Sequence, residues 1–473
     1  MWSPFKKMNK VLLLPSGGKP MLPTARHRAP ARRRLLLVSL ATAAAVATAG
    51  STTAATAAPT AASPAPVTAP VTAPATALPP LPVPKTVVLD GATIAATRAR
   101  LAAGGSARLK SELAVLTASA DAELTQGPWS VMDKKQTPPS GSKHDYLSEA
   151  PYWWPTEPVT DANPWGCPYV DKDGDVNPAV DGISDHLERG EMFTAVYNLA
   201  LAWYYTGNAG YARRAELDVR TWFTDPATAM NPDLNYAQFI PCSSAVRGEG
   251  GIDFSQQFTD VIDATAILDA GAPGWTGADH TAMNSWYGRF LSWNRTSPDG
   301  RAEFAQPNNH GSFAAMEDAA LALATGQQAT ARGLVQGVET RLLPGQLAAD
   351  GSEPLEITRT RSWHYSNFNL TALTRLAQIG QKVGVDLWSC TTPAGGSLLG
   401  SIDYLVPAAT GAAAWPYPEL DFQAFAADDD IHAAAVAGDA GASAALAKLT
   451  PPPGGDLWAL EPAPEQLDPV VTG

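Results

Sequence analysis

The chain has 473 residues, of which 45% are hydrophobic, and a formal net charge of −13 at pH 7. This length allows one large or two ordinary domains with a substantial core, and the acidic balance argues against nucleic acid as a partner. The three cysteines, Cys167, Cys242 and Cys390, fit no zinc-binding spacing, and outside the cell one pair could form a disulfide and leave one thiol.

The N-terminal part of the chain is predicted to lie outside the fold. Three arginines precede the apolar run LLLVSLATAAAVATA, which ends at the cleavage-type triplet Ala47-Thr48-Ala49, so residues 1–49 are predicted to be a signal peptide, with Met21 as an alternative start. Residues 50–85 form a Pro/Ala/Thr-rich linker. We therefore expect a secreted, soluble monomer with no membrane segment after signal cleavage.

Loss of residues 1–49 would also change the charge of the protein. This segment holds nine Lys or Arg and no Asp or Glu, so its removal lowers the formal net charge from −13 to −22. A chain with that charge repels a polyanion at long range and could bind one only through a local cationic pocket.

The region 86–449 is predicted to consist mainly of paired helices. Residues 184–223 carry apolar side chains at helical spacing on both sides of Thr206-Gly207, with Ser184 or Asp185 as the N-cap and Gly207 as the stop. The same layout recurs over 310–343, with a break at Thr325-Gly326. Further helical patterns cover residues 255–270, 278–293 and 363–383.

Strand signals are sparse. The clearest is CPYVDKDGDVNP at 167–178, where Asp173-Gly174 predicts a hairpin turn. The segment from Asp171 resembles a calcium loop only superficially, because its glycine comes too early and Gly182 stands where the glutamate belongs.

Repeated helix–turn–helix units in one domain of about 360 residues favour an all-α fold. We predict an incomplete or closed α/α toroid of helix hairpins with a few short strands, and a two-layered solenoid is the alternative. Loops before the first helix of each pair would then gather on one rim. Residues 450–473 form a Pro-rich C-terminal tail.

Two polar clusters precede the first helices of neighbouring pairs and should therefore lie close together on that rim. PNNHGSF at 307–313 places Asn308, Asn309 and His310 at a helix start, with Asn309 as a suitable N-cap. The segment 350–373 contributes Arg359, Arg361, His364 and Tyr365. Helix N-termini favour anions, although a capped helix start and surface ion pairs with Glu353 and Glu356 would explain the same residues structurally.

Two aromatic and polar loops are candidates for sugar binding, because aromatic loop residues suit stacking on sugar faces. The loop KHDYLSEAPYWWP at 143–155 offers His144, Tyr146, Tyr152, Trp153 and Trp154. The loop at 230–250 offers Asn235, Tyr236, Gln238 and Arg247.

Together, HDYLSEAPYWWP, NPDLNYAQFIP, PNNHGSF and DGSEPLEITRTRSWHYSNFNL resemble signature segments of the alginate lyase superfamily of α/α-toroid polysaccharide lyases, from Lys143 to at least Leu405. The resemblance implies β-elimination on a 1,4-linked polyuronate, alginate or glucuronan. It places the catalytic residues on Asn309, His310, Arg359 and Tyr365, with Arg361 as a competitor for the arginine role. Asn308, Arg361 and His364 join the loop residues as candidates for substrate binding.

The residue types suit this chemistry. An amide and a guanidinium can offset the negative charge of the sugar carboxylate while the neighbouring C5 proton leaves. Tyr365 would donate a proton to the leaving oxygen, with its pKa lowered by a nearby arginine, and the base would be His310 or Tyr365 itself, depending on the face that carries the proton. This chemistry needs no metal or other cofactor.

Two other functions are compatible with the sequence. An α/α-toroid glycoside hydrolase would need paired carboxylates, for which the candidates are Glu317, Asp318, Glu353 and Glu356. A non-catalytic carbohydrate-binding protein would use Trp153 and Trp154 for stacking.

Overall fold

The structure is a computed structural model that describes residues 80–243, 248–453 and 455–461. The chain divides into two compact units, Met1–Ala73 and Pro74–Gly473, and every described residue belongs to the second. The predicted signal peptide, most of the predicted linker and the last twelve residues lie outside the described residues. No helix in the described part of the chain combines the length and apolar character needed to cross a membrane.

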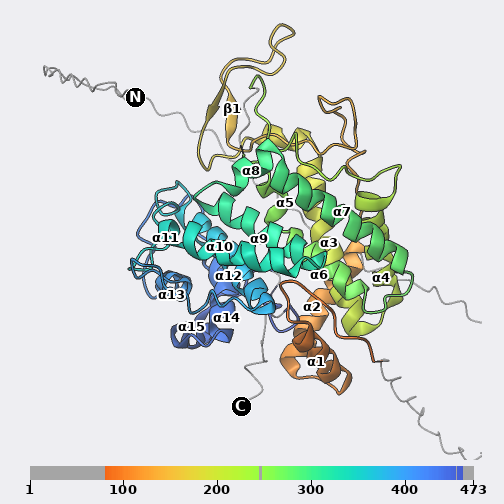
Figure 1. Ribbon diagram of the computed structural model, residues 1–473, viewed down its shortest axis with the longest axis vertical. Coiled ribbons are helices and arrows are strands. Elements are labelled where there is room, and N and C mark those ends of the chain that lie inside the picture. The colour runs from red at the N-terminus through yellow and green to blue at the C-terminus, as the bar shows by residue number, and fades with distance from the viewer. Residues whose placement is uncertain (1–79, 244–247, 454, 462–473) are drawn as a thin grey trace, which may run out of the picture. The chain divides into compact units, whose positions relative to one another are not determined.

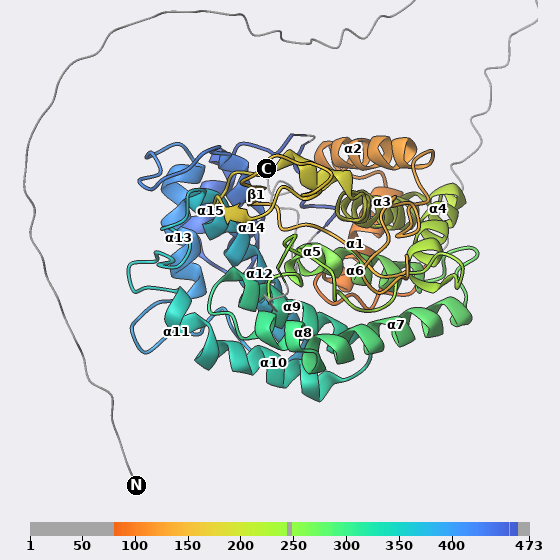
Figure 2. The ribbon, with the colours of Figure 1, turned by 90° about the horizontal axis from the view of Figure 1, so that it is seen from above.

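The helices of the second unit form two layers, as predicted for an α/α toroid. The inner layer contains α3 (Asp185–Thr206), α6 (Phe258–Leu268), α9 (Asn309–Ala324), α12 (Ser362–Val383) and α14 (Asp428–Val436). Each inner helix contacts the next. The outer layer contains α2 (Ala107–Glu123), α4 (Ala209–Val219), α7 (Gly277–Thr296), α10 (Gln328–Arg341) and α13 (Leu398–Ala409), which follow one another around the periphery in Figure 2.

Burial explains this division into layers. The inner helices α9 and α12 are buried on most of their surface, whereas α10 in the outer layer buries only one face. A helix that is apolar all round is stable only inside a protein, and an amphipathic helix belongs at its surface. The remaining helices are short or peripheral: α1 (Gly91–Ala102), α5 (Ile252–Ser255), α8 (Pro298–Phe304), α11 (Leu343–Gln346) and α15 (Ala440–Ala445).

The predicted helix boundaries are confirmed. Ser184 is the N-cap of α3, and Gly207 ends that helix in the left-handed conformation with φ of 74°. The second pair breaks at Thr325-Gly326 between α9 and α10, as its sequence indicates.

The hairpin differs from its prediction. Strands β1 (Trp153–Pro155) and β2 (Tyr169–Asp171) pair antiparallel, with Trp154 opposite Val170, so residues 156–168 make the connection. Asp173-Gly174 instead forms a turn after β2, where the Asp175 N–H donates to the Lys172 carbonyl at 2.9 Å. Figure 1 shows the hairpin projecting from one end of the helical body.

A disulfide joins this hairpin connection to a second loop. Cys167 is bonded to Cys242, and Cys390 has no disulfide partner. The packed part of the chain also extends beyond residues 86–449, because Leu81 packs against the core and Trp458 and Leu460 are buried in it.

Gly311 lets the start of α9 pack closely against the preceding loop. A Cβ atom at this position would collide with the Gln306 carbonyl oxygen and lie 3.3 Å from a Leu342 methyl group. Gly311→Ala should therefore lower the free energy of unfolding by about 1–3 kcal/mol, the usual cost of overpacking. Denaturant titration of the purified variant measures this change.

The matched control is Gly333→Ala in α10, where a Cβ atom would meet nothing within 4 Å. That substitution should stabilise the protein by up to about 1 kcal/mol, because alanine favours helix more than glycine does. Equal stabilisation by both substitutions would contradict the close packing at Gly311.

Candidate active site

The starts of α9 and α12 meet through one buried carboxylate. Glu356, in the loop before α12, accepts the backbone N–H of Asn309 at 3.0 Å and the Asn309 side-chain Nδ2 at 3.0 and 2.9 Å. The two polar clusters therefore lie together, as the paired-helix pattern predicts. Arg359 and His310 are both close enough to Glu356 to lower its pKa, which burial raises above the ordinary value.

Arg359 stacks on Tyr365, which lies in the first turn of α12. The guanidinium carbon lies 3.7 Å from the centre of the Tyr365 ring, a geometry that attracts a cation to the ring face. The Tyr365 hydroxyl lies 2.6 Å from the hydroxyl of Tyr152, which precedes β1. Arginine and phenol are thus brought together at the base of the hairpin.

Asp173 holds the same arginine from the other side. The Arg359 Nε donates to the Asp173 carboxylate at 2.9 Å, and the Thr360 backbone N–H donates to it at 3.1 Å. Arg361, the competing arginine, instead lies 4.0 Å from Glu419. Of this pair, Arg359 is the one whose guanidinium stacks on the Tyr365 ring, whereas Arg361 contacts Tyr365 through its backbone carbonyl, which accepts the Tyr365 N–H at 2.9 Å.

His310 forms a pair with Glu303 of α8. The His310 Nδ1 lies 2.7 Å from the Glu303 carboxylate, which is buried and also accepts the Gly251 N–H at 3.4 Å. Burial lowers the pKa of His310, but the charge and hydrogen bond of Glu303 outweigh it, so the pKa is raised above its ordinary value. The partner fixes Nδ1 and leaves Nε2 for chemistry.

The predicted pKa of Tyr365 is wrong in direction. Burial and the neighbouring Tyr152 raise the pKa of Tyr365 well above its ordinary value, and Arg359 lowers it by less. Tyr365 is therefore a neutral phenol at neutral pH. The adjacent His364 has its pKa lowered to about 4 by burial and by Arg361, so its imidazole is neutral as well.

Asn309 is not the N-cap that its sequence suggests. Asn308 holds that position, and Asn309 is the first residue of α9. The Ser312 N–H donates to the Asn308 carbonyl at 3.3 Å rather than to the Asn309 side chain. Glu356 accounts for this difference, because it accepts the Asn309 side-chain amide in the interior, and Asn308 is left in the N-cap position.

The tryptophans of the hairpin are partly exposed on β1. Trp154 donates its Nε1 to the Asp175 carbonyl at 2.9 Å, and the Lys172 ammonium lies 4.2 Å from the centre of the Trp154 ring. Trp153 lies next to it on the strand and faces the opposite side. Tyr152 is the residue of this loop that reaches the catalytic candidates.

Three predicted residues of the second loop border a cavity of about 430 Å³: Asn235, Tyr236 and Gln238. Trp293 and Gly251 line the same cavity. Glu303 accepts the Gly251 N–H and contacts His310, so two hydrogen bonds connect the wall of this cavity to His310. Arg247 lies outside the described residues.

Two predicted substrate contacts do not belong to this group. Tyr146 has no exposed surface, and its hydroxyl donates to Asp253 at 3.1 Å, so the prediction that it contacts substrate is wrong. His144 lies against another part of the surface, where its Nδ1 is 2.6 Å from the Ala229 carbonyl oxygen. Both side chains hold the loop in place.

The sequence analysis missed the roles of three carboxylates: Asp173, Glu303 and Glu356. The sequence suggests Glu356 as a surface ion-pair partner or a hydrolase carboxylate, but it is 1% exposed and binds Asn309. No sequence motif marks Asp173 or Glu303, because folding brings each of them next to the arginine or histidine that it contacts.

The carboxylates proposed for a hydrolase are unsuited to that role. Glu317 and Asp318 are buried and accept the same Asn294 amide at 3.0 and 3.2 Å. Glu353 is buried beside Asn369, 2.6 Å from its amide nitrogen. Glu356, the fourth candidate, is buried with both carboxylate oxygens on the Asn309 amide, so none of the four can flank a glycosidic bond in this geometry.

Known proteins resemble this chain over most of its described length. The family described as "Alginate lyase" matches residues 130–415. Among solved structures, an alginate lyase from Bacteroides ovatus has 32% sequence identity and a TM-score of 0.74, covering 80% of this chain and 99% of that one. No curated protein matches the chain.

Two complexes of alginate lyase A1-III with a tetrasaccharide share the fold. The histidine-to-alanine variant has 18% identity and a TM-score of 0.52, covering 81% of this chain and 98% of that one. The tyrosine-to-phenylalanine variant has 16% identity and a TM-score of 0.51, covering 80% and 96%. These similarities confirm the predicted α/α toroid.

The Glu303 carboxylate should control the protonation of His310. Glu303→Gln removes the negative charge that raises the pKa of His310, so this pKa should fall below its wild-type value. Titration of the histidine ring protons by NMR measures the change. His364, with its pKa of about 4 set by burial and Arg361, is the internal control and should not move. An unchanged His310 titration would show that Glu303 does not set its charge.

Proposed function

The chain belongs to the alginate lyase family and is a polysaccharide lyase, and on this premise we propose that it is secreted and cleaves a 1,4-linked polyuronate, alginate or glucuronan, by β-elimination. The observation that carries the proposal is the stacking of Arg359 on Tyr365, 3.7 Å from its ring centre, beside the Glu356–Asn309 and Glu303–His310 pairs. This places a cation, an amide, a phenol and an imidazole in one site.

Arg359 is the proposed group that offsets the substrate carboxylate. Its Nε and Nη2 bind Asp173, while its Nη1 makes no hydrogen bond to another described residue and can meet a second carboxylate. Charge on that carboxylate grows as the C5 proton leaves, so a fixed guanidinium stabilises the transition state more than the bound substrate. Asn309 would contribute by sharing its amide between Glu356 and the substrate.

Tyr365 is the proposed acid. As a neutral phenol it can donate its proton to the C4 oxygen while the C4–O bond breaks and the C4–C5 double bond forms. The short contact with Tyr152 then offers a hydrogen bond to the oxygen that has lost its proton. A buried phenol with a raised pKa suits this role better than that of a resting tyrosinate.

His310 is the proposed base when the C5 proton and the leaving oxygen lie on opposite faces of the sugar. Its Nε2 accepts the C5 proton once the imidazole is neutral, and Glu303 stabilises the imidazolium that results. The two uronates of alginate are C5 epimers, so they present this proton on opposite faces. For the other epimer, Tyr365 would have to accept the proton after losing its own.

The substrate contacts are proposed along the loops that frame this site. Tyr152, Trp153 and Trp154 would bind from the hairpin, and His364 and Arg361 from the start of α12. Asn235, Tyr236 and Gln238 would bind on the side of His310, along the cavity that they line. Residues 1–49 as a signal peptide, a linker from residue 50 that ends before the packed Leu81, and a monomeric state complete the proposal.

Replacement of the acid should abolish turnover. Tyr365→Phe should lower kcat on a panel of polymannuronate, polyguluronate and glucuronan by about 10²–10⁴-fold, the usual contribution of a general acid, with little change in KM. The measurement is the ultraviolet absorbance of the 4,5-unsaturated product, which a hydrolase does not form.

The matched control is Tyr404→Phe, because Tyr404 also shares its hydroxyl with a second tyrosine, Tyr417, at 2.8 Å, but lies on α13. This variant should retain wild-type activity. Full activity of the Tyr365 variant on the same substrates would remove Tyr365 from the mechanism.

The pH profile should separate the two candidate bases. If His310 is the base, kcat/KM rises as pH increases through its raised pKa and falls only where Tyr365 loses its proton. Glu303→Gln lowers the pKa of His310 and should therefore move the acid limb to lower pH. If Tyr365 alone is the base, activity appears only in alkali and the acid limb does not respond to Glu303→Gln.

A further inference from the structure

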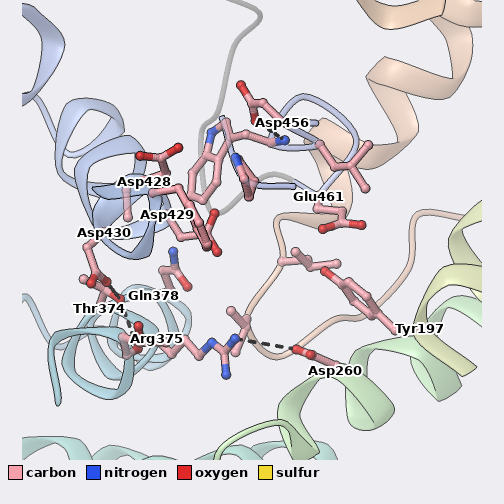
Figure 3. Close-up of a pocket in the computed structure, with 18 of the residues that line it drawn as sticks. Tyr197, Asp260, Thr374, Arg375, Gln378, Asp428, Asp429, Asp430, Asp456 and Glu461 are labelled. Carbon is pink, nitrogen blue, oxygen red and sulfur yellow. Dashed lines mark hydrogen bonds and ion pairs between the residues drawn. The ribbon is translucent and has the colours of Figure 1, made fainter. Parts of the chain in front are cut away.

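A second cavity of about 440 Å³ lies away from the candidate active site (Figure 3). Its walls come from α6, α12 and α14, from Val88 and Leu89 near the N-terminal end of the described chain, and from residues 452–461 at the other end. The lining residues of α12 begin at Thr371, six residues or about 9 Å along the helix axis after Tyr365, and neither Arg359 nor Tyr365 lines the cavity. The cavity is therefore separate from the Arg359–Tyr365 site.

Carboxylates outnumber cations in this wall. Arg375 is the one lysine or arginine among the described lining residues, and it pairs with Asp260 at 3.9 Å. Asp263 is satisfied by the Leu89 N–H at 2.8 Å, and Asp456 by Arg108 at 3.0 Å.

Four further carboxylates line the cavity without an ion pair to another described residue: Asp428, Asp429, Asp430 and Glu461. Buried carboxylates that face one space without a paired cation are costly to hold in the charged form. A cation in the space would offset this cost.

Three buried oxygens in the wall lack a hydrogen-bond donor: Asp428 Oδ1, Asp430 Oδ2 and Gln378 Oε1. Asp430 is 1% exposed, and while its Oδ1 accepts from the Thr374 hydroxyl at 3.0 Å, its Oδ2 has no partner. Gln378 is 4% exposed, and its Oε1 has no partner either. Figure 3 shows both residues on one side of the cavity, with Asp260 and Glu461 across from them. A bound cation would be a partner for the Gln378 amide oxygen and for the Asp430 carboxylate alike.

We propose that this cavity binds a hydrated divalent cation of the Mg²⁺ or Ca²⁺ type. Both ions prefer oxygen ligands, and Mg²⁺ in particular keeps several waters and binds through one or two carboxylates. In the described part of the chain no three histidine, cysteine or carboxylate side chains lie at metal-ligand spacing, so a bare ion would find too few ligands. The cavity is large compared with the roughly 30 Å³ that each water occupies, so the ion fits with its water shell.

Such a cation would stabilise the fold by joining parts of the chain that are distant in sequence. Asp430 and Gln378 belong to α14 and α12, Asp260 to α6, and Glu461 to the C-terminal segment. Binding to the folded state alone raises its stability with cation concentration. This inference concerns stability and does not depend on the proposed lyase mechanism.

Terbium luminescence and thermal unfolding test the proposal. After dialysis against a chelator, millimolar Mg²⁺ or Ca²⁺ should raise the Tm in a saturable way. Tb³⁺, which occupies such oxygen sites, should show emission sensitised by Trp458, an indole in the cavity wall, and Mg²⁺ or Ca²⁺ should displace it. Comparing the two displacement curves identifies which ion the site prefers.

Variants assign the binding to this cavity. Asp430→Asn and Gln378→Leu should each weaken the cation affinity by between about 10- and 100-fold. Asp403→Asn on α13, where Asp403 is exposed beside Asp439, is the matched acidic control and should bind as wild type. Trp458→Phe should lose most of the sensitised emission and keep the rise in Tm, which tests the site even if an aspartate variant fails to fold.

Three results would overturn the proposal. One is the absence of any change in Tm or Tb³⁺ emission. Another is equal weakening by Asp403→Asn and Asp430→Asn, which would show only diffuse binding to an acidic surface. The third is stabilisation by spermidine but not by either metal ion, which would make the cavity a site for an organic polycation.

Discussion

The buried carboxylate of Glu356 is the contact on which the candidate site depends. It accepts the backbone and side-chain N–H groups of Asn309 and so joins the start of α9 to the loop that leads into α12. Removing one partner of a buried charged group is costly, because the other is left without compensation. This contact therefore holds His310, next to Asn309, and Arg359, three residues after Glu356, in a fixed relation.

The β1–β2 hairpin and the turn after it supply the remaining contacts of the candidate site. Asp173 and Tyr152 reach across to Arg359 and Tyr365, and the Cys167–Cys242 bond ties the hairpin connection to the loop that carries Gln238. An arginine partly neutralised by an aspartate is fixed in position but keeps N–H groups free for a second anion. A small cationic site can therefore exist in a strongly acidic protein that repels polyanions at long range.

The different surroundings of Tyr365 and His310 suit the first to the role of acid and the second to that of base. Burial keeps Tyr365 protonated, while Glu303 favours the charged form of His310 and His364 stays neutral with a pKa of about 4. Three titratable rings within one site thus have pKa values shifted by different causes. Because their surroundings shift the pKa values of Tyr365 and His310 for different reasons, one group can hold a proton and the other can accept one at the same pH.

Helical periodicity and capping are local properties of the chain, so the sequence alone predicts the paired helices, their ends at Gly207 and Thr325-Gly326, and the nearness of the two polar clusters. Tertiary packing instead buries Tyr146, stacks Arg359 rather than Arg361 on Tyr365, and raises the pKa of Tyr365. It alone also brought Asp173, 186 residues away, to Arg359. Burial and long-range contacts depend on how distant segments pack, and the spacing and composition of residues within one segment do not predict that packing.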